Sequence, residues 1–120
     1  MTNEFDKKEK FYRAVIWSEI EEGIISSGAF NHRDLSVDRQ LNRENKVAVK
    51  YISAYKKGWI VSIQVSQCDM VDVKYVERPE NNNPYHCILY KEIYGDRLTR
   101  AQSRFLAKNC IIELQRDDND

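Results

Sequence analysis

The stretch that decides the fold is GWIVSIQVSQCDMVDVKYVERPENNNPYHCILY, residues 58–90. Apolar side chains at positions 59, 61, 63 and 65 recur at every second residue, the period of a β-strand with one buried face. Positions 71, 73 and 75 repeat this pattern, and residues 86–90 are a third short apolar run. Between the last two runs, residues 78–84 form a polar loop that begins and ends near prolines. The stretch therefore predicts two or three strands and one rigid loop.

The composition is typical of one soluble globular domain. The chain has 120 residues, and domains commonly contain about 100–150. Hydrophobic residues make up 42% and charged residues 32%. Nineteen basic and nineteen acidic residues cancel, so the net charge does not indicate binding to nucleic acid. No apolar run approaches the roughly 20 residues of a membrane span, and the N-terminus lacks the pattern of a signal peptide. We therefore expect a cytoplasmic protein with no membrane partner.

The cysteines and histidines do not predict a metal site. Cys68, Cys87 and Cys110 are odd in number, widely spaced and set among apolar residues, which favours reduced, buried thiols. The two histidines and three cysteines lack the close pairs of a zinc site, and no glycine-rich phosphate loop is present. We therefore expect no metal and no cofactor.

The remaining elements are predicted from the same periodicities and from helix-capping residues. Ser18 and the acids after it predict a helix of about one turn that ends at Gly23. The other expected elements are strands at 11–17, 35–38 and 110–114, and helices at about 43–55 and 98–108. These elements indicate an α+β domain over residues 11–114, a small, mostly antiparallel sheet packed with two or three helices. Residues 1–10 are expected to be flexible and residues 115–120 to form a disordered acidic tail.

His86 is the most suggestive polar residue. It follows Asn83-Pro84-Tyr85, where the rigid loop enters a strand, and an asparagine side chain at such a turn can hold the backbone. A histidine in this position can act as an acid or a base or bind an anion; alternatively, it only hydrogen-bonds the loop. We expect Asn83 and His86 to form hydrogen bonds within the domain, with at least one of the two side chains accessible to solvent.

Four further polar residues lie on the predicted strands near the N-terminus. Ser36 and Asp38 alternate on one strand and share a face, and Arg39 is next to them. Together they could bind a sugar or a phosphate, or form a buried network that holds a loop. Arg13 interrupts an apolar strand, so it must have a partner or face solvent, as in an anion site or at a sheet edge.

Arg100, Arg104 and Lys108 recur one turn apart on the last predicted helix. This stripe is a candidate surface for an acidic partner, and it is equally typical of a solvated helix face.

Several stretches together resemble a family of small bacterial proteins of uncharacterised function, from about residue 11 to 110. The residues that carry the resemblance are Tyr12-Arg13-Ala14-Val15, Gly28-Ala29-Phe30, Leu35-Ser36-Val37-Asp38-Arg39 and Asn83-Pro84-x-His86, ahead of a C-terminal helix. The resemblance implies a single bacterial domain and singles out the same polar residues, but no reaction. A weaker similarity is to ADP-ribosyltransferase-type domains, in which Arg13, Ser36 and either Glu77 or Glu92 would take the functional positions.

Two functions follow as hypotheses, and the sequence leaves open whether the protein is an enzyme. The first is a non-enzymatic binding or accessory module in a bacterial multi-component system, one encoded on a mobile element or serving in defence. It would act through a protein partner or as a homo-oligomer, and the seven tyrosines and two tryptophans favour such contacts. The alternative is a small enzyme or sensor for a nucleotide or another phosphoester. There Arg13 and Arg39 would hold the anion, Asp38 would orient it and His86 would transfer a proton, which requires these residues to meet in one pocket.

Overall fold

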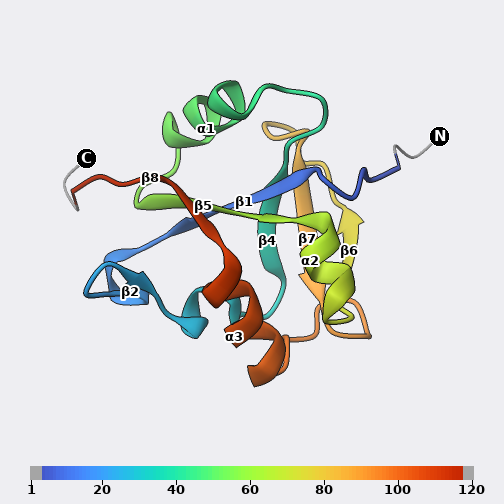
Figure 1. Cartoon of the computed structure of the whole chain (residues 1–120). Helices are drawn as coiled ribbons and strands as arrows, with labels where there is room; N and C mark the ends of the chain where they lie inside the picture. Colours follow the sequence, from blue (N-terminus) through green and yellow to red (C-terminus); the bar gives the residue numbers. More distant parts are fainter. Residues whose placement is uncertain (1–3, 118–120) are drawn as a thin grey trace.

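The sheet has six strands in the order β6-β7-β4-β1-β5-β8, and every neighbouring pair is antiparallel (Figure 1). This arrangement comes from a computed structural model that describes residues 4–117. The strands are β1 (Lys10–Val15), β4 (Leu35–Arg39), β5 (Trp59–Gln64), β6 (Lys74–Glu77), β7 (His86–Tyr90) and β8 (Ile111–Leu114). The prediction of an α+β fold with a mostly antiparallel sheet is confirmed.

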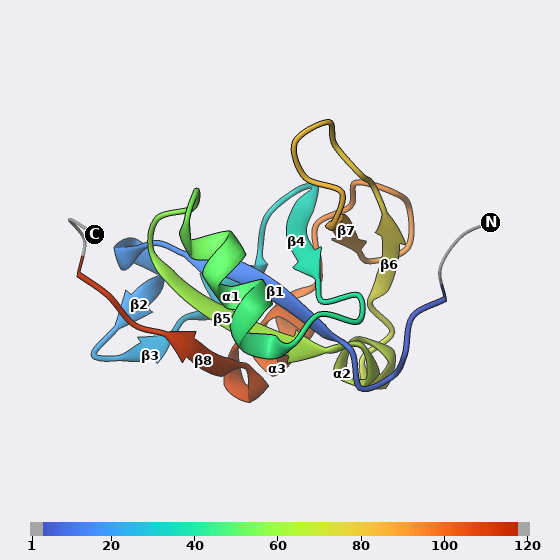
Figure 2. The same cartoon turned by 90° about the horizontal axis from the view of Figure 1, so that it is seen from above.

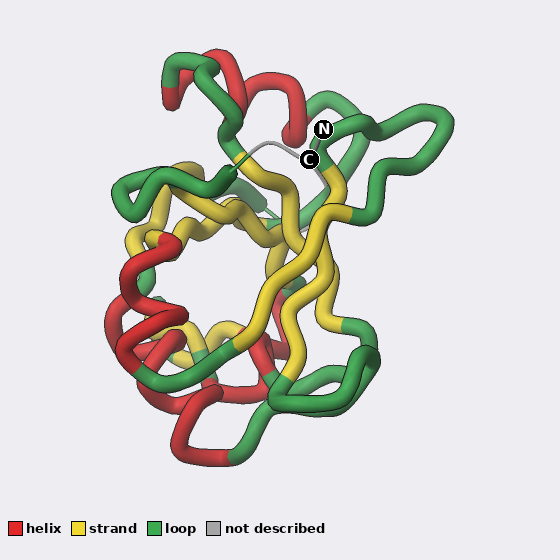
Figure 3. Tube along the Cα trace, turned by 90° about the vertical axis from the view of Figure 1, so that its right-hand side faces the viewer, coloured by secondary structure: helices red, strands yellow, loops and turns green. Residues whose placement is uncertain are grey.

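Helices cover both faces of the sheet, which gives three layers. Helix α1 (Asn45–Ser53) lies on one face, and α3 (Arg100–Asn109) lies on the other (Figures 1 and 2). The short helix α2 (Val65–Met70) and the 3-10 segment η2 (Ser27–Phe30) pack into the same core as α3. Figure 3 shows that the strands between these helices are strongly twisted and curved. We call the two sides of the sheet the α1 face and the α3 face.

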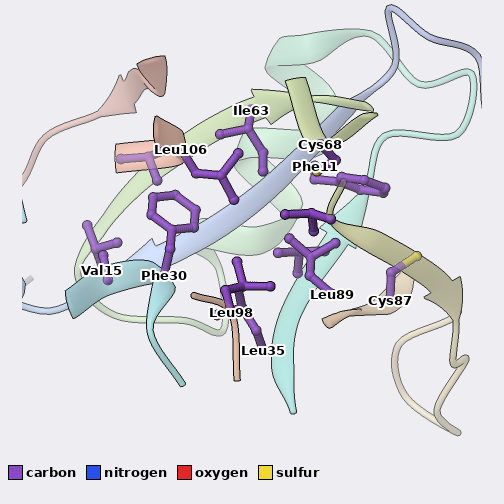
Figure 4. Packing of buried hydrophobic residues seen from close by; sticks show 14 of the residues in the cluster. Phe11, Val15, Phe30, Leu35, Ile63, Cys68, Cys87, Leu89, Leu98 and Leu106 are labelled. Atoms are coloured by element: carbon purple, nitrogen blue, oxygen red, sulfur yellow. The ribbon is translucent and has the colours of Figure 1, made fainter. Parts of the chain in front are cut away.

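The main hydrophobic core lies on the α3 face. Phe11, Val37 and Ile63 project there from three strands, as the period of two requires, and Phe30 packs beside Leu106 of α3 (Figure 4). On the α1 face the corresponding cluster is small, with Tyr12, Ala48, Ile52 and Ile60 at its centre. Much of the α1 face beyond this cluster is therefore left for polar side chains.

Two local predictions were wrong because residues at turns determined the backbone conformation against the pattern of apolar and capping residues. After the 3-10 segment η1 (Trp17–Glu19), the chain forms a hairpin of β2 (Ile20–Glu21) and β3 (Ile24–Ile25) in place of the predicted helix. Glu22 and Gly23 both have positive φ, which suits a two-residue hairpin turn. The strand predicted to continue through position 65 ends at Gln64, because the Gln67 side chain accepts from Gln64 N at 2.8 Å and α2 begins there.

The folded domain also extends past both predicted boundaries. On the N-terminal side, Phe5 packs against the core, Glu9 is buried and Lys10 already belongs to β1. At the C-terminal side, the Arg116 guanidinium donates to Ser53 O, Gly58 O and Lys56 O, while Arg116 O accepts from Trp59 Nε1 at 2.8 Å. Arg116 is therefore bound to the domain and does not belong to a disordered tail; the rest of the predicted flexible ends, residues 1–3 and 118–120, lies outside the described range.

No helix within residues 4–117 has the length and apolar content that a membrane-spanning segment requires.

Candidate functional site

The candidate site lies on the α1 face, where β1 and β4 separate. The two strands pair only at Phe11 with Arg39 and at Tyr12 with Asp38, and they diverge beyond these positions. The C-terminal end of α1 and the loop after it border the opening. The resulting pocket has a volume of about 290 Å³. Its lining residues come from β1, β4, β7 and the α1 region: Tyr12, Arg13, Ala14, Ile16, Ser36, Val37, Asp38, Ile52, Lys56, Lys57 and His86.

His86 is held in one orientation by two hydrogen bonds. Its Nδ1 lies 2.8 Å from Arg78 O, and because a carbonyl only accepts, Nδ1 must carry the hydrogen. In the neutral imidazole, Nε2 is then an acceptor, and it lies 3.1 Å from Ser36 Oγ. The ring therefore presents its lone pair to a serine hydroxyl inside the pocket.

Ser36 reaches His86 because the two residues lie on neighbouring strands and on the same face. The ladder pairs Asp38 with His86, so Ser36 is the diagonal neighbour of the histidine. The Ser36 hydroxyl also lies 3.3 Å from Asp34 O. Its single hydrogen thus has two acceptors within reach, and His86 Nε2 is the nearer one.

Asp38 is buried and holds the loops around the pocket. Asp38 Oδ2 accepts from the Tyr55 hydroxyl at 2.8 Å, and Oδ1 accepts from Asn83 Nδ2 at 2.9 Å. Asn83 Oδ1 in turn accepts from Tyr85 N at 3.1 Å, which orders the backbone just before His86. Burial, and next the Asp38 carboxylate, raise the pKa of Tyr55, so its hydroxyl stays protonated as a donor. The predicted hydrogen bonds of Asn83 and His86 are confirmed, and half-buried His86 is the member accessible to solvent.

Arg13 alternates with Phe11 and Val15, so its side chain leaves β1 on the α3 side, and its guanidinium spans the gap between the separated strands. Its Nε donates to Ala29 O at 2.5 Å and its Nη1 to Ser36 O at 2.8 Å. Nη2 forms no hydrogen bond within residues 4–117. Burial lowers the pKa of Arg13, and the charge of Glu19 opposes this shift; the guanidinium stays charged at neutral pH. The predicted edge position was wrong, since β1 lies between β4 and β5.

Lys56 and Lys57 line the pocket together with Ile16 and add positive charge to it. They precede Gly58, whose φ of +95° suits glycine and whose missing Cβ would lie 2.2 Å from Val15 O. This close approach brings the lysines against the end of β1. Arg116 holds the same turn through its bonds to the carbonyls of Ser53, Lys56 and Gly58.

Arg39 does not belong to this pocket, which corrects the predicted grouping with Ser36 and Asp38. Alternation along β4 turns it to the α3 face, where its side chain is 1% exposed. There it forms two 2.7 Å hydrogen bonds with the Glu9 carboxylate, a 3.2 Å ion pair with Glu77 and a cation–π contact with Phe5. Burial alone would lower the pKa of Arg39, but hydrogen bonding to Glu9 and the two carboxylate charges raise it.

The other candidates lie outside the pocket. Glu77 pairs with Arg39 and Glu92 is exposed, so neither glutamate meets Ser36 as the ADP-ribosyltransferase comparison requires. Arg100, Arg104 and Lys108 are exposed on α3, and their role toward a partner remains a prediction. Within residues 4–117 no group of three or more His, Cys, Asp or Glu side chains is placed to hold a metal ion.

The cysteines are unsuited to nucleophilic chemistry. Cys68 and Cys87 are fully buried, and burial raises the pKa of each thiol to about 12. Cys110 is partly buried, and burial raises its pKa to about 11. Thiolates are therefore scarce at neutral pH.

Sequence reasoning missed the residues that the α1 region contributes. Lys56 and Lys57 fit the usual preference for cations at a helix C-terminus, so they carried no separate signal of a site. Tyr55 acts by donating a hydrogen bond to Asp38, and Arg116 acts by donating to backbone carbonyl groups. In both cases the partner is distant in sequence. The one feature of the sequence that could have indicated these residues is the pair of lysines directly before Gly58, a position that requires glycine.

Comparison with known proteins gives no relative. A scan against protein-family models, a search of curated proteins and a search of solved structures each found no match to this chain.

Proposed function

We propose that the protein binds a small phosphorylated molecule in this pocket. The observation that carries the proposal is the convergence of Arg13, Lys56, Lys57 and the Ser36–His86 pair on one concavity. Guanidinium and ammonium groups are the side chains that proteins use most for phosphate, and a hydroxyl and an imidazole add neutral hydrogen-bonding groups.

The charges within the pocket favour an anion. Three cationic side chains line it against one carboxylate, that of Asp38. Both Asp38 oxygens already accept hydrogen bonds from Tyr55 and Asn83, so this carboxylate acts mainly as a support. Arg13 Nη2, in contrast, forms no hydrogen bond with the described residues, so it keeps its capacity to donate to a ligand oxygen.

The pocket size favours a small ligand. Its volume of about 290 Å³ lies near the lower end of the range for ligand pockets, about 300–1,000 Å³. Ala14, Ile16 and Ile52 supply an apolar wall for the organic part of the molecule. A phosphate carrying one sugar or one small ring fits these features better than an oligonucleotide.

Titration calorimetry and thermal melting test the proposal. The probes are inorganic phosphate, ribose 5-phosphate and adenosine 5′-monophosphate, with ribose and adenosine as unphosphorylated controls. We expect saturable binding of at least one phosphorylated probe and none of its control. A ligand at about 100 times its Kd should stabilise the fold by about 2.7 kcal/mol.

A pair of matched variants ties the binding to the pocket. Lys56→Ala/Lys57→Ala removes two pocket charges, while Lys46→Ala/Lys50→Ala removes two exposed charges from the same helix region outside the pocket. We expect the first variant to weaken binding at least tenfold and to reduce its salt dependence, and the second to have little effect. Equal effects of the two variants, or no saturable binding of any phosphorylated probe, would contradict the proposal.

Binding to a protein partner is the second candidate function. Ile16, Trp17 and Ile24 are 52%, 68% and 70% exposed in the segment that follows β1, and large apolar side chains of this kind anchor interfaces. Light scattering of the purified protein, alone and with products of neighbouring genes, tests it. A strict monomer that captures none of these products at micromolar concentration would contradict it.

A further inference from the structure

We propose that Ser36 and His86 form a nucleophile–base pair that cleaves phosphoesters bound in this pocket. The inference rests on the proposed function, because it requires the phosphate to bind beside these two residues. It goes further, since a binding site alone needs neither an oriented imidazole nor a serine hydroxyl directed at it.

The geometry matches the arrangement that activates a serine. The base lies within hydrogen-bond reach of the nucleophile, with His86 Nε2 at 3.1 Å from Ser36 Oγ. A third group orients the base, because Arg78 O accepts from His86 Nδ1 at 2.8 Å. Arg78 therefore contributes a positioning backbone carbonyl, in the place that a carboxylate occupies in many triads.

The support around the pair restrains its movement. Asn83 holds the turn before His86 by accepting from Tyr85 N, and it donates to Asp38, the ladder partner of His86. Ser36 lies on β4, an interior strand paired with β7. Both reacting side chains thus come from the sheet itself, where positions are better restrained than on loops.

The reaction has two balanced steps. Ser36 Oγ attacks phosphorus and forms a P–O bond, while its proton passes to His86 Nε2. The bond from phosphorus to the ester oxygen breaks, the electron pair leaves with that oxygen, and the leaving alcohol takes the proton from Nε2. Water then attacks the phosphoserine and gives a proton to Nε2, and Ser36 Oγ departs and takes that proton back. The products are one alcohol and one phosphate, with no change of oxidation state.

The cationic side chains suit attack at phosphorus. In phosphoryl transfer the charge resides on the non-bridging oxygens, and fixed cations beside them stabilise the transition state. Arg13, Lys56 and Lys57 line the same pocket as Ser36 and His86.

Covalent labelling is the decisive experiment. A phosphonofluoridate probe reacts with an activated serine and releases fluoride, so it does not depend on which alcohol the natural substrate carries. We expect the folded wild-type chain to be labelled at Ser36, located by peptide mass spectrometry, and the urea-unfolded chain to remain unlabelled. In parallel, p-nitrophenyl phosphate should release nitrophenolate in the presence of a chelator, which silences contaminating metal-dependent phosphatases.

Three variants of the pair and two matched controls separate catalysis from folding and from binding. Ser36→Ala should lose the label and the turnover while still binding inorganic phosphate. His86→Ala and His86→Gln should slow labelling at least about 100-fold, in the range of general-base catalysis. The matched controls are Ser53→Ala, whose hydroxyl donates to Lys50 O, and His32→Ala, whose ring pairs with Glu19; both should react like wild type. Thermal melting of each variant confirms that it folds.

The outcomes distinguish this inference from the proposed function. A wild-type chain that binds the phosphorylated probes but shows no label and no turnover overturns the nucleophile assignment and leaves the binding function standing. Labelling at another residue, or turnover that survives in Ser36→Ala, also overturns it. A chain that neither binds nor reacts overturns both.

Discussion

Arg13 and Arg39 lie on neighbouring strands and interrupt similar apolar runs, yet they end in opposite surroundings. Arg39 faces the α3 side, where Glu9 and Glu77 enclose it and its side chain is 1% exposed. Arg13 donates to two backbone carbonyls, and its Nη2 forms no hydrogen bond within the described chain. Both residues were candidates to hold an anion, and the difference between them lies in which partners the rest of the chain brings.

A structural arginine and a ligand-binding arginine differ in the charge of the groups that hold them. A guanidinium enclosed by carboxylates has its charge neutralised within the fold, and removing one member leaves the other charged and buried. A guanidinium held by carbonyls keeps its full charge, because carbonyls are neutral. It can therefore still attract a ligand.

The largest expected effect comes from breaking the buried pair. Arg39→Met should destabilise the protein by about 3–5 kcal/mol, because Glu9 would be left charged and buried. Urea unfolding followed by circular dichroism measures the loss. Phosphate binding by the fraction that remains folded should be unchanged, and a loss below about 1 kcal/mol would show that the pair is not structurally important.

Arg13→Met should cost less stability than Arg39→Met but should weaken the binding of phosphorylated probes. We expect a smaller stability loss of about 1–3 kcal/mol, from two partly buried hydrogen bonds to backbone carbonyls, together with at least a tenfold weaker affinity for phosphorylated probes. Calorimetry and urea unfolding on the same preparation measure both quantities. Unchanged affinity would place Arg13 with Arg39 as a structural residue.

Asn83→Ala tests whether the loop supports the pocket. The change removes the donor to Asp38 and the acceptor of Tyr85 N, and Asn83 is buried. We expect a loss of about 1–2 kcal/mol by chemical unfolding, because buried partners are left unsatisfied. Asn82→Ala, at an exposed position of the same loop, is the matched control and should change stability by less than about 0.5 kcal/mol. Similar losses in the two variants would contradict the supporting role of Asn83.

Glu113 lies in a second polar cluster on the α1 face, where Asn45 of α1 is one of its partners. Burial alone would raise the pKa of Glu113, but hydrogen bonds from Lys10, Ser62 and Asn45 lower it below its usual range. A depressed carboxyl pKa contributes stability above the ordinary pKa, and this contribution is lost as pH falls through the folded-state pKa.

Glu113→Gln should therefore be less stable than wild type at neutral pH, by about 1 kcal/mol, the difference between a charged and a neutral hydrogen bond. The gap should close as pH falls from about 7 to about 3. Urea unfolding at several pH values measures it. A gap that stays constant with pH would show that the carboxylate charge does not contribute.

Short-range patterns predicted much of the fold. The third strand predicted at 86–90 matches β7, and the helix predicted at about 98–108 matches α3, which Thr99 caps by accepting from Gln102 N. The hairpin after η1 and helix α2 were missed, because in each case one or two side chains at a turn outweighed the periodicity of the segment. Of the residues expected to meet in one pocket, Arg13, Ser36, Asp38 and His86 line it and Arg39 does not, while their role in binding stays a prediction.

The sequence alone determined which residues share a face, because side chains alternate along any strand whatever its neighbours are. That is why Ser36 and Asp38 lie together and Arg39 faces away from them. Only the tertiary structure decided what each polar residue meets. Strand order places His86 opposite Asp38, the separation of β1 from β4 opens the pocket, and Arg116 holds the turn whose lysines line it. These contacts join residues up to 63 positions apart. Such long-range pairings leave no local pattern in the sequence from which they could be predicted.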